Sequence, residues 1–322
     1  MKILFASGSP LAGVCELNAR LISELYPGIH EARVLNNGPG RHAWYLRPGS
    51  GRPKTYSLAD PSQVREALEW CDHCACQANV GARNLKAVDL LKKKTWSFIW
   101  HGCEQNGCLD RSFKPEDYKH VRFTSIGQGW IERQASFFAK FDLKVVPNLI
   151  SIDDSIHRPI PWADRIQRVA FAPSNTRAGA VNDKGVAATE AALAGLPLKV
   201  LLRRPFEECM REKQKSVLGI DELVTPSYHR SGLEFLSQGT TCMCSVGEAA
   251  EKALKDATGA IQIPFVCAKG AGLGFARRFV TEYLAAGGDA QAAWGAEARA
   301  WMEQFYAPKA LLDRHYLPVY AG

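Results

Sequence analysis

Short apolar segments with the pattern of strands alternate with helix-like segments along this chain. The first of them, residues 2–7 (KILFAS), ends in the glycine-containing loop 8–13, and an amphipathic helix follows that loop. Because strands that alternate with helices usually form a mainly parallel sheet covered on both faces, we expect an α/β fold.

The alternation restarts after residues 147–165, which are rich in proline and lack a clear periodicity, so this segment is a natural linker. We therefore expect two doubly wound, Rossmann-like domains, residues 1–150 and 151–300, and a helical tail at 301–322 that crosses back to the first domain. Two such domains place a ligand cleft between the carboxyl ends of their strands. Further strands are expected at 32–37, 71–77, 96–102, 121–127, 143–148, 168–173, 198–203, 240–245 and 260–266, with helices near 61–70, 82–92, 130–140, from about 184, near 206–217 and after Ser245.

Length and composition agree with a two-domain globular protein. A chain of 322 residues exceeds the size of one hydrophobic core, and 46% hydrophobic with 23% charged residues is ordinary for globular domains. No apolar run approaches the ~18 residues of a membrane span, and the N-terminus lacks the longer apolar region of a cleaved signal. We expect a cytoplasmic protein.

The ten cysteines lie mostly within the expected strands, where they suit small apolar packing positions. We therefore expect reduced, buried thiols. The alternative is a metal site, although the spacings match no standard zinc pattern; its candidate ligands are Cys71, Cys74, Cys76, Cys103, Cys108, His73 and His101.

The positive charge is concentrated in the first half. Residues 1–150 contain 20 Lys and Arg against 14 Asp and Glu, whereas residues 151–322 contain 20 against 19. Segments 41–54 and 91–98 also interleave basic residues with Trp or Tyr, a composition suited to phosphates and bases. A polyanion partner such as DNA is one interpretation, and an ordinary solvated face is the other.

Several expected strand ends carry residues suited to anion chemistry. The loop 171–185 offers Arg177 and Lys184, and two cations there suit a diphosphate. The loop containing Gly8 and Gly13 can bring backbone amides near an anion, although it lacks the Walker lysine and the dinucleotide spacing of glycines. His101 stands at the end of the strand expected at 96–102, just past the apolar residues WSFIW.

Residues 245–260 (SVGEAAEKALKDATGA) place two carboxylates on one expected helix. Ser245 followed by Glu248 is a capping-box pattern, which satisfies amide donors at a helix start. Asp256 lies two turns further along, about 80° round from Glu248. The pattern alone leaves both a helix start and a ligand site open.

The order of these motifs resembles that of the GT-B glycosyltransferases, especially the retaining group that uses nucleotide sugars. The resemblance covers nearly the whole chain: a strand and glycine loop, a strand-end His, a Pro-Asn hinge at Pro147 and Asn148, a loop with Arg and Lys, and a Ser followed by two acidic residues. The sequence departs from the group's pattern at two places. Asp256 stands where the group has Glu, and the sequence lacks a glycine-rich segment after the first Glu.

The resemblance implies site residues on both domains. Arg177 and Lys184, with Asn175 in the same loop, would bind the donor diphosphate, and Gly8 and Gly13 would approach the same phosphate or the sugar. His101 would contact the transferred sugar or the acceptor. Glu248 would lie near the donor sugar, with Ser245 beside it, and Asp256 would bind the ribose hydroxyls, since a carboxylate accepts two hydrogen bonds from a vicinal diol.

The implied activity is transfer of a sugar from a nucleotide sugar, with UDP as the expected leaving group. No prosthetic group or metal is expected, because the cations take the place of a metal. The short, basic chain resembles compact bacteriophage glycosyltransferases that decorate hydroxymethylated bases in DNA. The alternatives are a polysaccharide or lipid acceptor, a non-catalytic nucleic-acid-binding protein on the same scaffold, and a nucleotide-sugar epimerase.

Overall fold

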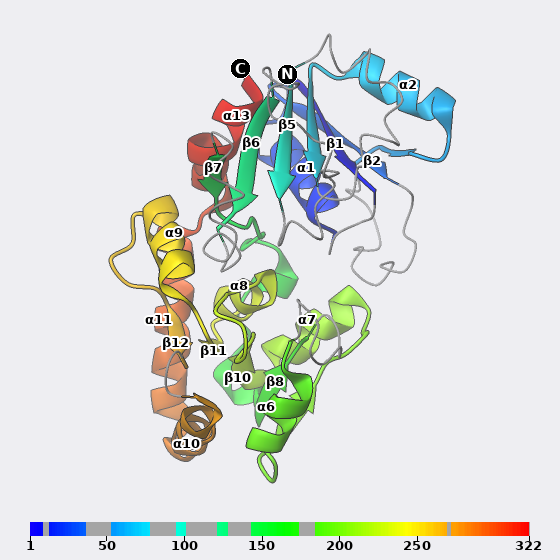
Figure 1. Ribbon diagram of the computed structural model, residues 1–322. Helices are drawn as coiled ribbons and strands as arrows, with labels where there is room; N and C mark the ends of the chain where they lie inside the picture. The colour runs from blue at the N-terminus through cyan, green and yellow to red at the C-terminus, as the bar shows by residue number, and fades with distance from the viewer. Residues whose placement is uncertain are drawn as a thin grey trace. The chain divides into compact units, whose positions relative to one another are not determined.

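The computed structural model divides the chain into two compact units, coloured along the chain in Figure 1. The first unit is Met1–Leu149 together with Pro308–Gly322, and the second unit is Ile150–Ala307. The structure describes residues 1–8, 13–36, 53–77, 95–100, 121–127, 143–173, 184–268 and 272–321. Within these ranges, no helix has the length and apolar character needed to cross a bilayer.

The described part of the first unit is built on a parallel sheet of seven strands in the order β3-β2-β1-β4-β5-β6-β7. Residues Ile3 to Ala6 of β1 are fully buried, as expected for a central strand of a parallel sheet covered on both faces. The described elements of this part are β1 (Lys2–Ser7), α1 (Val14–Leu25), β2 (Glu31–Asn36), β3 (Thr55–Ser57), α2 (Pro61–Trp70), β4 (His73–Gln77), β5 (Thr95–Trp100), β6 (Val121–Ile126) and β7 (Leu143–Val146).

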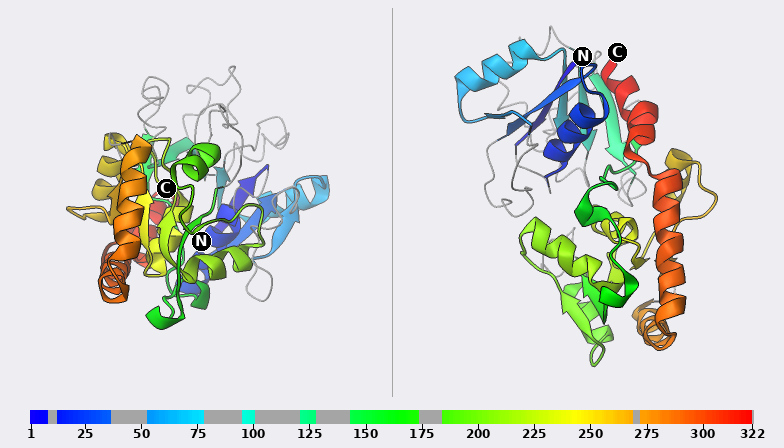
Figure 2. Two further views of the ribbon diagram at one scale, coloured as in Figure 1. Left: turned by 90° about the horizontal axis from the view of Figure 1, so that it is seen from below. Right: turned by 180° about the vertical axis from the view of Figure 1, so that it is seen from behind.

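The end of the chain completes the core of the first unit through α12 (Pro308–Leu311), the π-helical turn η7 (Leu312–Tyr316) and α13 (Leu317–Ala321). The Tyr316 hydroxyl donates to the Pro147 carbonyl, and the Tyr320 ring packs edge-on against Phe5 at 5.8 Å. Figures 1 and 2 show that the two chain ends lie close together on this unit.

Among its described residues, the second unit contains a parallel sheet of five strands in the order β12-β11-β10-β8-β9. Its strands are β8 (Ile166–Phe171), β9 (Leu198–Val200), β10 (Ser216–Ile220), β11 (Thr241–Cys244) and β12 (Phe265–Cys267). Its helices are η5 (Ser155–His157), η6 (Trp162–Asp164), α6 (Val186–Ala192), α7 (Phe206–Gln214), α8 (Arg230–Ser237), α9 (Glu248–Thr258), α10 (Gly272–Ala285) and α11 (Gly288–Phe305).

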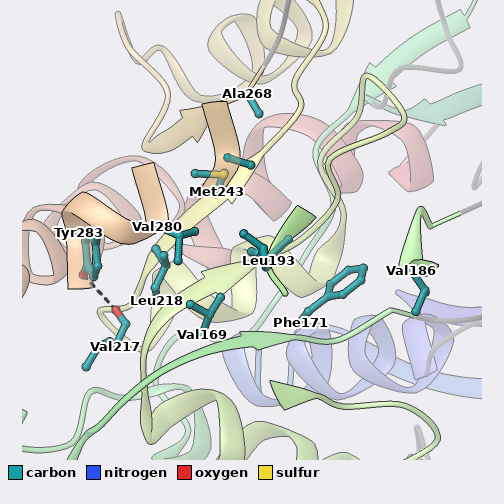
Figure 3. Packing of buried hydrophobic residues seen from close by; sticks show 12 residues of the cluster. Val169, Phe171, Val186, Leu193, Val217, Leu218, Met243, Ala268, Val280 and Tyr283 are labelled. Carbon is teal, nitrogen blue, oxygen red and sulfur yellow. Dashed lines mark hydrogen bonds between the residues drawn. The ribbon is translucent and has the colours of Figure 1, made fainter. Parts of the chain in front are cut away.

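Successive residues of β10 point to opposite faces of this sheet, so that helices pack on both. Leu218 lies in the hydrophobic layer shared with Val280 and Tyr283 of α10, where the Tyr283 hydroxyl donates to the Val217 carbonyl (Figure 3). On the other face, a Cβ at Gly219 would lie 2.4 Å from the Phe235 ring of α8. Glycine at this position therefore allows α8 to approach the strand closely.

The expected architecture is confirmed: both sheets are parallel and helices alternate with their strands. The sequence pattern missed β3, β10 and α8, and it extended the helix of 206–217 into the first residues of β10. Charged residues precede the five buried residues of β10. The apolar run is therefore so short that it fits a strand and the end of a helix equally well. The helices expected near 82–92 and 130–140 lie outside the described residues.

Candidate functional site

Polar residues gather where the strands of the second unit end. Lys184 precedes α6 and closes the connection that leaves β8, Asp221 and Glu222 follow β10 directly, and Ser245 follows β11. Because all strands of this sheet are parallel, their carboxyl ends lie along one edge. In open α/β sheets this edge is where ligands bind.

Lys184 is held by two acceptors. Its Nζ atom lies 2.8 Å from Oε2 of Glu222 and 2.6 Å from Nε2 of His229. The Lys184 side chain is 12% exposed and the Glu222 side chain is fully buried. The Lys184 ammonium therefore lies at the carboxyl edge of the sheet, where it contacts the buried carboxylate of Glu222.

The His229 ring lies beside the Lys184 ammonium. An ammonium can only donate, so the Nε2 atom of His229 is the acceptor in this contact. The Nδ1 atom lies 3.4 Å from Oε2 of Glu222 and 3.5 Å from Oδ2 of Asp221. The ring thus lies between the cation and two carboxylates.

Both carboxylates are fixed by main-chain groups. The Thr225 N–H donates to Oε1 of Glu222 at 3.2 Å, and the His229 N–H donates to Oδ2 of Asp221. Burial alone would raise the pKa of Asp221, but its contacts with His229 and Lys184 more than offset that effect, so the pKa lies below its usual value. Asp221 is therefore a buried anion at neutral pH.

The backbone conformation of Gly185 helps to hold the preceding residue, Lys184, at the carboxyl edge of the sheet. Gly185 begins α6 with a φ of 59°, in the left-handed region that favours glycine. A Cβ at this position would also lie 2.1 Å from Cγ2 of Val224, in the segment that follows Glu222. Gly185, next to Lys184, therefore packs directly against the segment that follows Glu222.

Ser245 reaches the same cluster through its main chain but does not cap a helix. Its N–H donates to the Glu222 carbonyl at 2.7 Å. Helix α9 begins at Glu248 with Gly247 as its N-cap, without a side-chain capping hydrogen bond, so the expected capping box is wrong. Gly247, in an extended conformation, carries the chain from Ser245 into the first helical turn.

Glu248 and Asp256 both lie on α9 and are exposed. Asp256 forms an ion pair with Lys252 one turn earlier, at 2.5 Å, with side chains that are 64% and 76% exposed. Such an exposed pair contributes little to stability and leaves the carboxylate accessible to a ligand.

Other predicted site residues lie on the first unit or outside the described residues. Gly8 follows β1, and Gly13 begins α1 with a φ of 67°. The predicted residues His101, Asn175 and Arg177 lie outside the described residues.

The suspected cysteine–histidine metal cluster is only partly described. Cys74 and Cys76 contact each other at 3.8 Å, and His73 uses both ring nitrogens on Thr95 and Ser97. A hydrogen bond with Cys76 and burial raise the pKa of the Cys74 thiol well above its usual value. In the described part of the chain, no three His, Cys, Asp or Glu side chains are grouped so that they could hold a metal ion.

Asp221, Glu222 and His229 were missed by sequence reasoning. The available signal was an acidic pair directly after the apolar residues VLGI, the usual place for a strand-end site. This acidic pair was not identified as a candidate site because β10 was not predicted as a strand. The pairing of Glu222 with Lys184 joins residues 38 positions apart, which no local pattern reveals.

The whole chain is similar to solved glycosyltransferase structures. It matches an alpha-glucosyltransferase (AGT) in complex with UDP at 9% identity and a TM-score of 0.72, covering 99% of each chain. An alpha-glucosyltransferase with UDP and a 13-mer DNA containing a HMU base gives 9% identity, a TM-score of 0.70, and coverage of 100% of this chain and 99% of that one. The Anabaena protein HepE with UDP-glucose gives 13% identity, a TM-score of 0.64 and coverage of 98% of both chains.

No protein-family model matches the chain, and no curated protein matches it by sequence. The structural likeness extends over both units and includes both parallel sheets. The chain therefore has the GT-B fold, as expected from the order of its motifs.

Proposed function

We propose that this protein is a glycosyltransferase that moves a sugar from a UDP-sugar to an acceptor. The observation that carries this proposal is the Lys184 ammonium at the carboxyl edge of the second sheet, in a GT-B fold. Two of the similar structures hold UDP or UDP-glucose. A nucleoside diphosphate is the anion that suits such a site.

In this reaction the sugar leaves a diphosphate on which negative charge develops. Lys184 and Arg177 neutralise that charge, and Asn175 supports the same loop. Glu248 contacts the transferred sugar, Ser245 lies beside the donor, and Asp256 accepts hydrogen bonds from the ribose hydroxyls. Fixed cations stabilise a departing diphosphate without a metal ion, which gives this site a metal-independent mechanism.

The first unit contributes the acceptor side of the reaction. Gly8 and Gly13 offer backbone amides to the donor, and His101 contacts the transferred sugar or the acceptor. The proposed acceptor is a hydroxymethylated pyrimidine base in DNA, which would place the enzyme in the cytoplasm of a bacterium or phage-infected cell. The basic excess of residues 1–150 and the likeness to a DNA-bound alpha-glucosyltransferase support this choice.

A transfer assay with mass spectrometry as its readout tests both the proposed donor and the proposed acceptor. The protein is mixed with a panel of sugar nucleotides and with DNA whose cytosine or uracil bases are either hydroxymethylated or plain. We expect one sugar mass to be added only to the hydroxymethylated DNA and only from a UDP-sugar. Transfer to a polysaccharide or lipid acceptor alone would refute the DNA assignment, and no transfer to any acceptor would favour a non-catalytic binding protein.

A further inference from the structure

A buried carboxylate lies directly behind the lysine that is proposed to meet the diphosphate. Oε2 of Glu222 is 2.8 Å from Nζ of Lys184, and the Glu222 side chain is fully buried. At this distance the carboxylate cancels much of the attraction that the ammonium offers to an incoming anion. This inference rests on the proposed function, in which Lys184 contacts the nucleoside diphosphate.

The hydrogen bonds around Lys184 allow a ligand to bind without breaking this pair. A lysine ammonium has three N–H bonds, and among the described residues Glu222 and His229 each accept one of them. In the part of the chain that the structure describes, no acceptor takes the third N–H, which leaves it for a phosphate oxygen. Glu222 stays in place because Thr225 donates to its Oε1 atom and Ser245 donates to its carbonyl.

The Glu222 carboxylate disfavours binding of the product UDP more than binding of the donor UDP-sugar. Free UDP carries more negative charge than a UDP-sugar, because its terminal phosphate has lost the sugar ester. A fixed carboxylate near the site therefore repels UDP more strongly than it repels the UDP-sugar. In many enzymes the release of product limits turnover, so such a difference is useful.

We propose that Glu222 is a positioning residue that holds Lys184 toward the diphosphate while its own charge keeps the affinity for UDP low, so that UDP leaves after transfer. Glu222 contacts Lys184 and not the reacting atoms. Its role is to orient the cation and to limit how tightly the cation retains the product.

Glu222→Gln tests this role because the amide keeps the shape and one accepting oxygen while removing the charge. Calorimetry with UDP and with UDP-glucose should give an approximately tenfold lower Kd for UDP and a smaller decrease for UDP-glucose. In transfer assays kcat should fall as product release slows. A merely structural role would weaken both ligands and would not tighten UDP.

Glu212→Gln is the matched control. Glu212 on α7 pairs with Arg168 and Lys199, so that the same change removes a carboxylate from a two-cation cluster that does not include Lys184. UDP and UDP-glucose should bind this variant as they bind the parent. If Glu222→Gln does not fold, Asp221→Asn provides a second variant, for which we expect a smaller tightening of UDP because Asp221 faces His229.

The outcomes separate this inference from the proposed function. A parent protein that binds UDP, with variants at Glu222 and Asp221 that bind it no more tightly, would overturn the inference and leave the transferase intact. A parent that binds neither UDP nor UDP-glucose would overturn both. Equal tightening in Glu212→Gln would also overturn the inference, since net charge and not the position of Glu222 would then explain the effect.

Discussion

Lys184 is 12% exposed and pairs with a fully buried carboxylate, so its replacement affects stability as well as the proposed activity. Lys184→Met alone should cost about 3 kcal/mol in the free energy of unfolding, because it leaves Glu222 buried without its cation. The double variant Lys184→Met with Glu222→Gln should recover most of that stability but not sugar transfer. Chemical denaturation and transfer assays check the two effects separately.

The loss of transfer expected in these variants can be compared with that in Arg177→Ala, which removes the other cation proposed to bind the diphosphate. Removing one cation from a developing diphosphate should cost about 2–4 kcal/mol in the activation free energy. Lys199→Ala removes a lysine that pairs with Glu212 instead, and should leave transfer unchanged. Transfer at the parent rate in the double variant and in Arg177→Ala would contradict the diphosphate site.

His73 should make the stability of the protein depend on pH. Burial, with the nearby charge of Arg122, lowers the pKa of His73 to about 4, whereas an unfolded histidine has a pKa of about 6.5. Between these values the unfolded chain binds the proton that the folded chain excludes, so stability is full above about pH 6.5 and is lost as the pH falls toward 4. His73→Gln should remove about 2 kcal/mol of the stability difference between pH 7 and pH 5, measured by denaturant unfolding. An unchanged pH dependence would refute this role of His73.

At the scale of elements, two glycines with open space around them should respond oppositely to alanine. Gly259 ends α9 with a φ of 77°, whereas Gly274 lies inside α10 without a positive φ, and no described atom lies within 4 Å of a Cβ built at either position. Gly259→Ala should destabilise the protein by about 1 kcal/mol, because alanine is strained in the left-handed region. Gly274→Ala should stabilise it by about 0.5–1 kcal/mol through helix propensity. Shifts of the same sign in thermal unfolding would contradict these assignments.

Elements with a clear period were predictable from sequence, and short buried ones were not. Residues 2–7 and 61–70 were assigned with the bounds that the structure gives to β1 and α2. The helix at Glu248–Thr258 was expected, but its start was placed at Ser245, because a serine and a glutamate three residues apart match a capping box whether or not the chain turns there. Lys184 was recognised as a candidate from its loop, whereas its partner Glu222 depends on a tertiary contact that only the folded sheet creates.

At the scale of the whole molecule, the uneven charge predicts how the acceptor binds. If DNA binds the basic first half, its affinity should fall steeply and linearly with salt on a log–log plot, because phosphate contacts release counterions. Charge reversal at Lys92, Lys93 and Lys94, which lie outside the described residues, should flatten that slope without changing the affinity for UDP. Fluorescence anisotropy with labelled DNA measures the slope. Absence of DNA binding at low salt would refute the DNA acceptor and leave the transferase.

The two units also separate the proposed tasks, since the proposed anion site lies on the second unit and the basic excess lies on residues 1–150. Three solved structures that match both units hold UDP or UDP-glucose, and one of these three also holds DNA. A binding protein that had lost catalysis would share this fold, so the reaction itself must be measured.

Release of UDP from a UDP-sugar in the absence of acceptor tests the central claim most directly, because only an active transferase lets water replace the acceptor. We expect slow formation of UDP by the parent protein, and none above background by the double variant of Lys184 and Glu222. A parent protein that folds and binds UDP, yet releases no UDP from any UDP-sugar and transfers no sugar, would contradict the assignment as a glycosyltransferase.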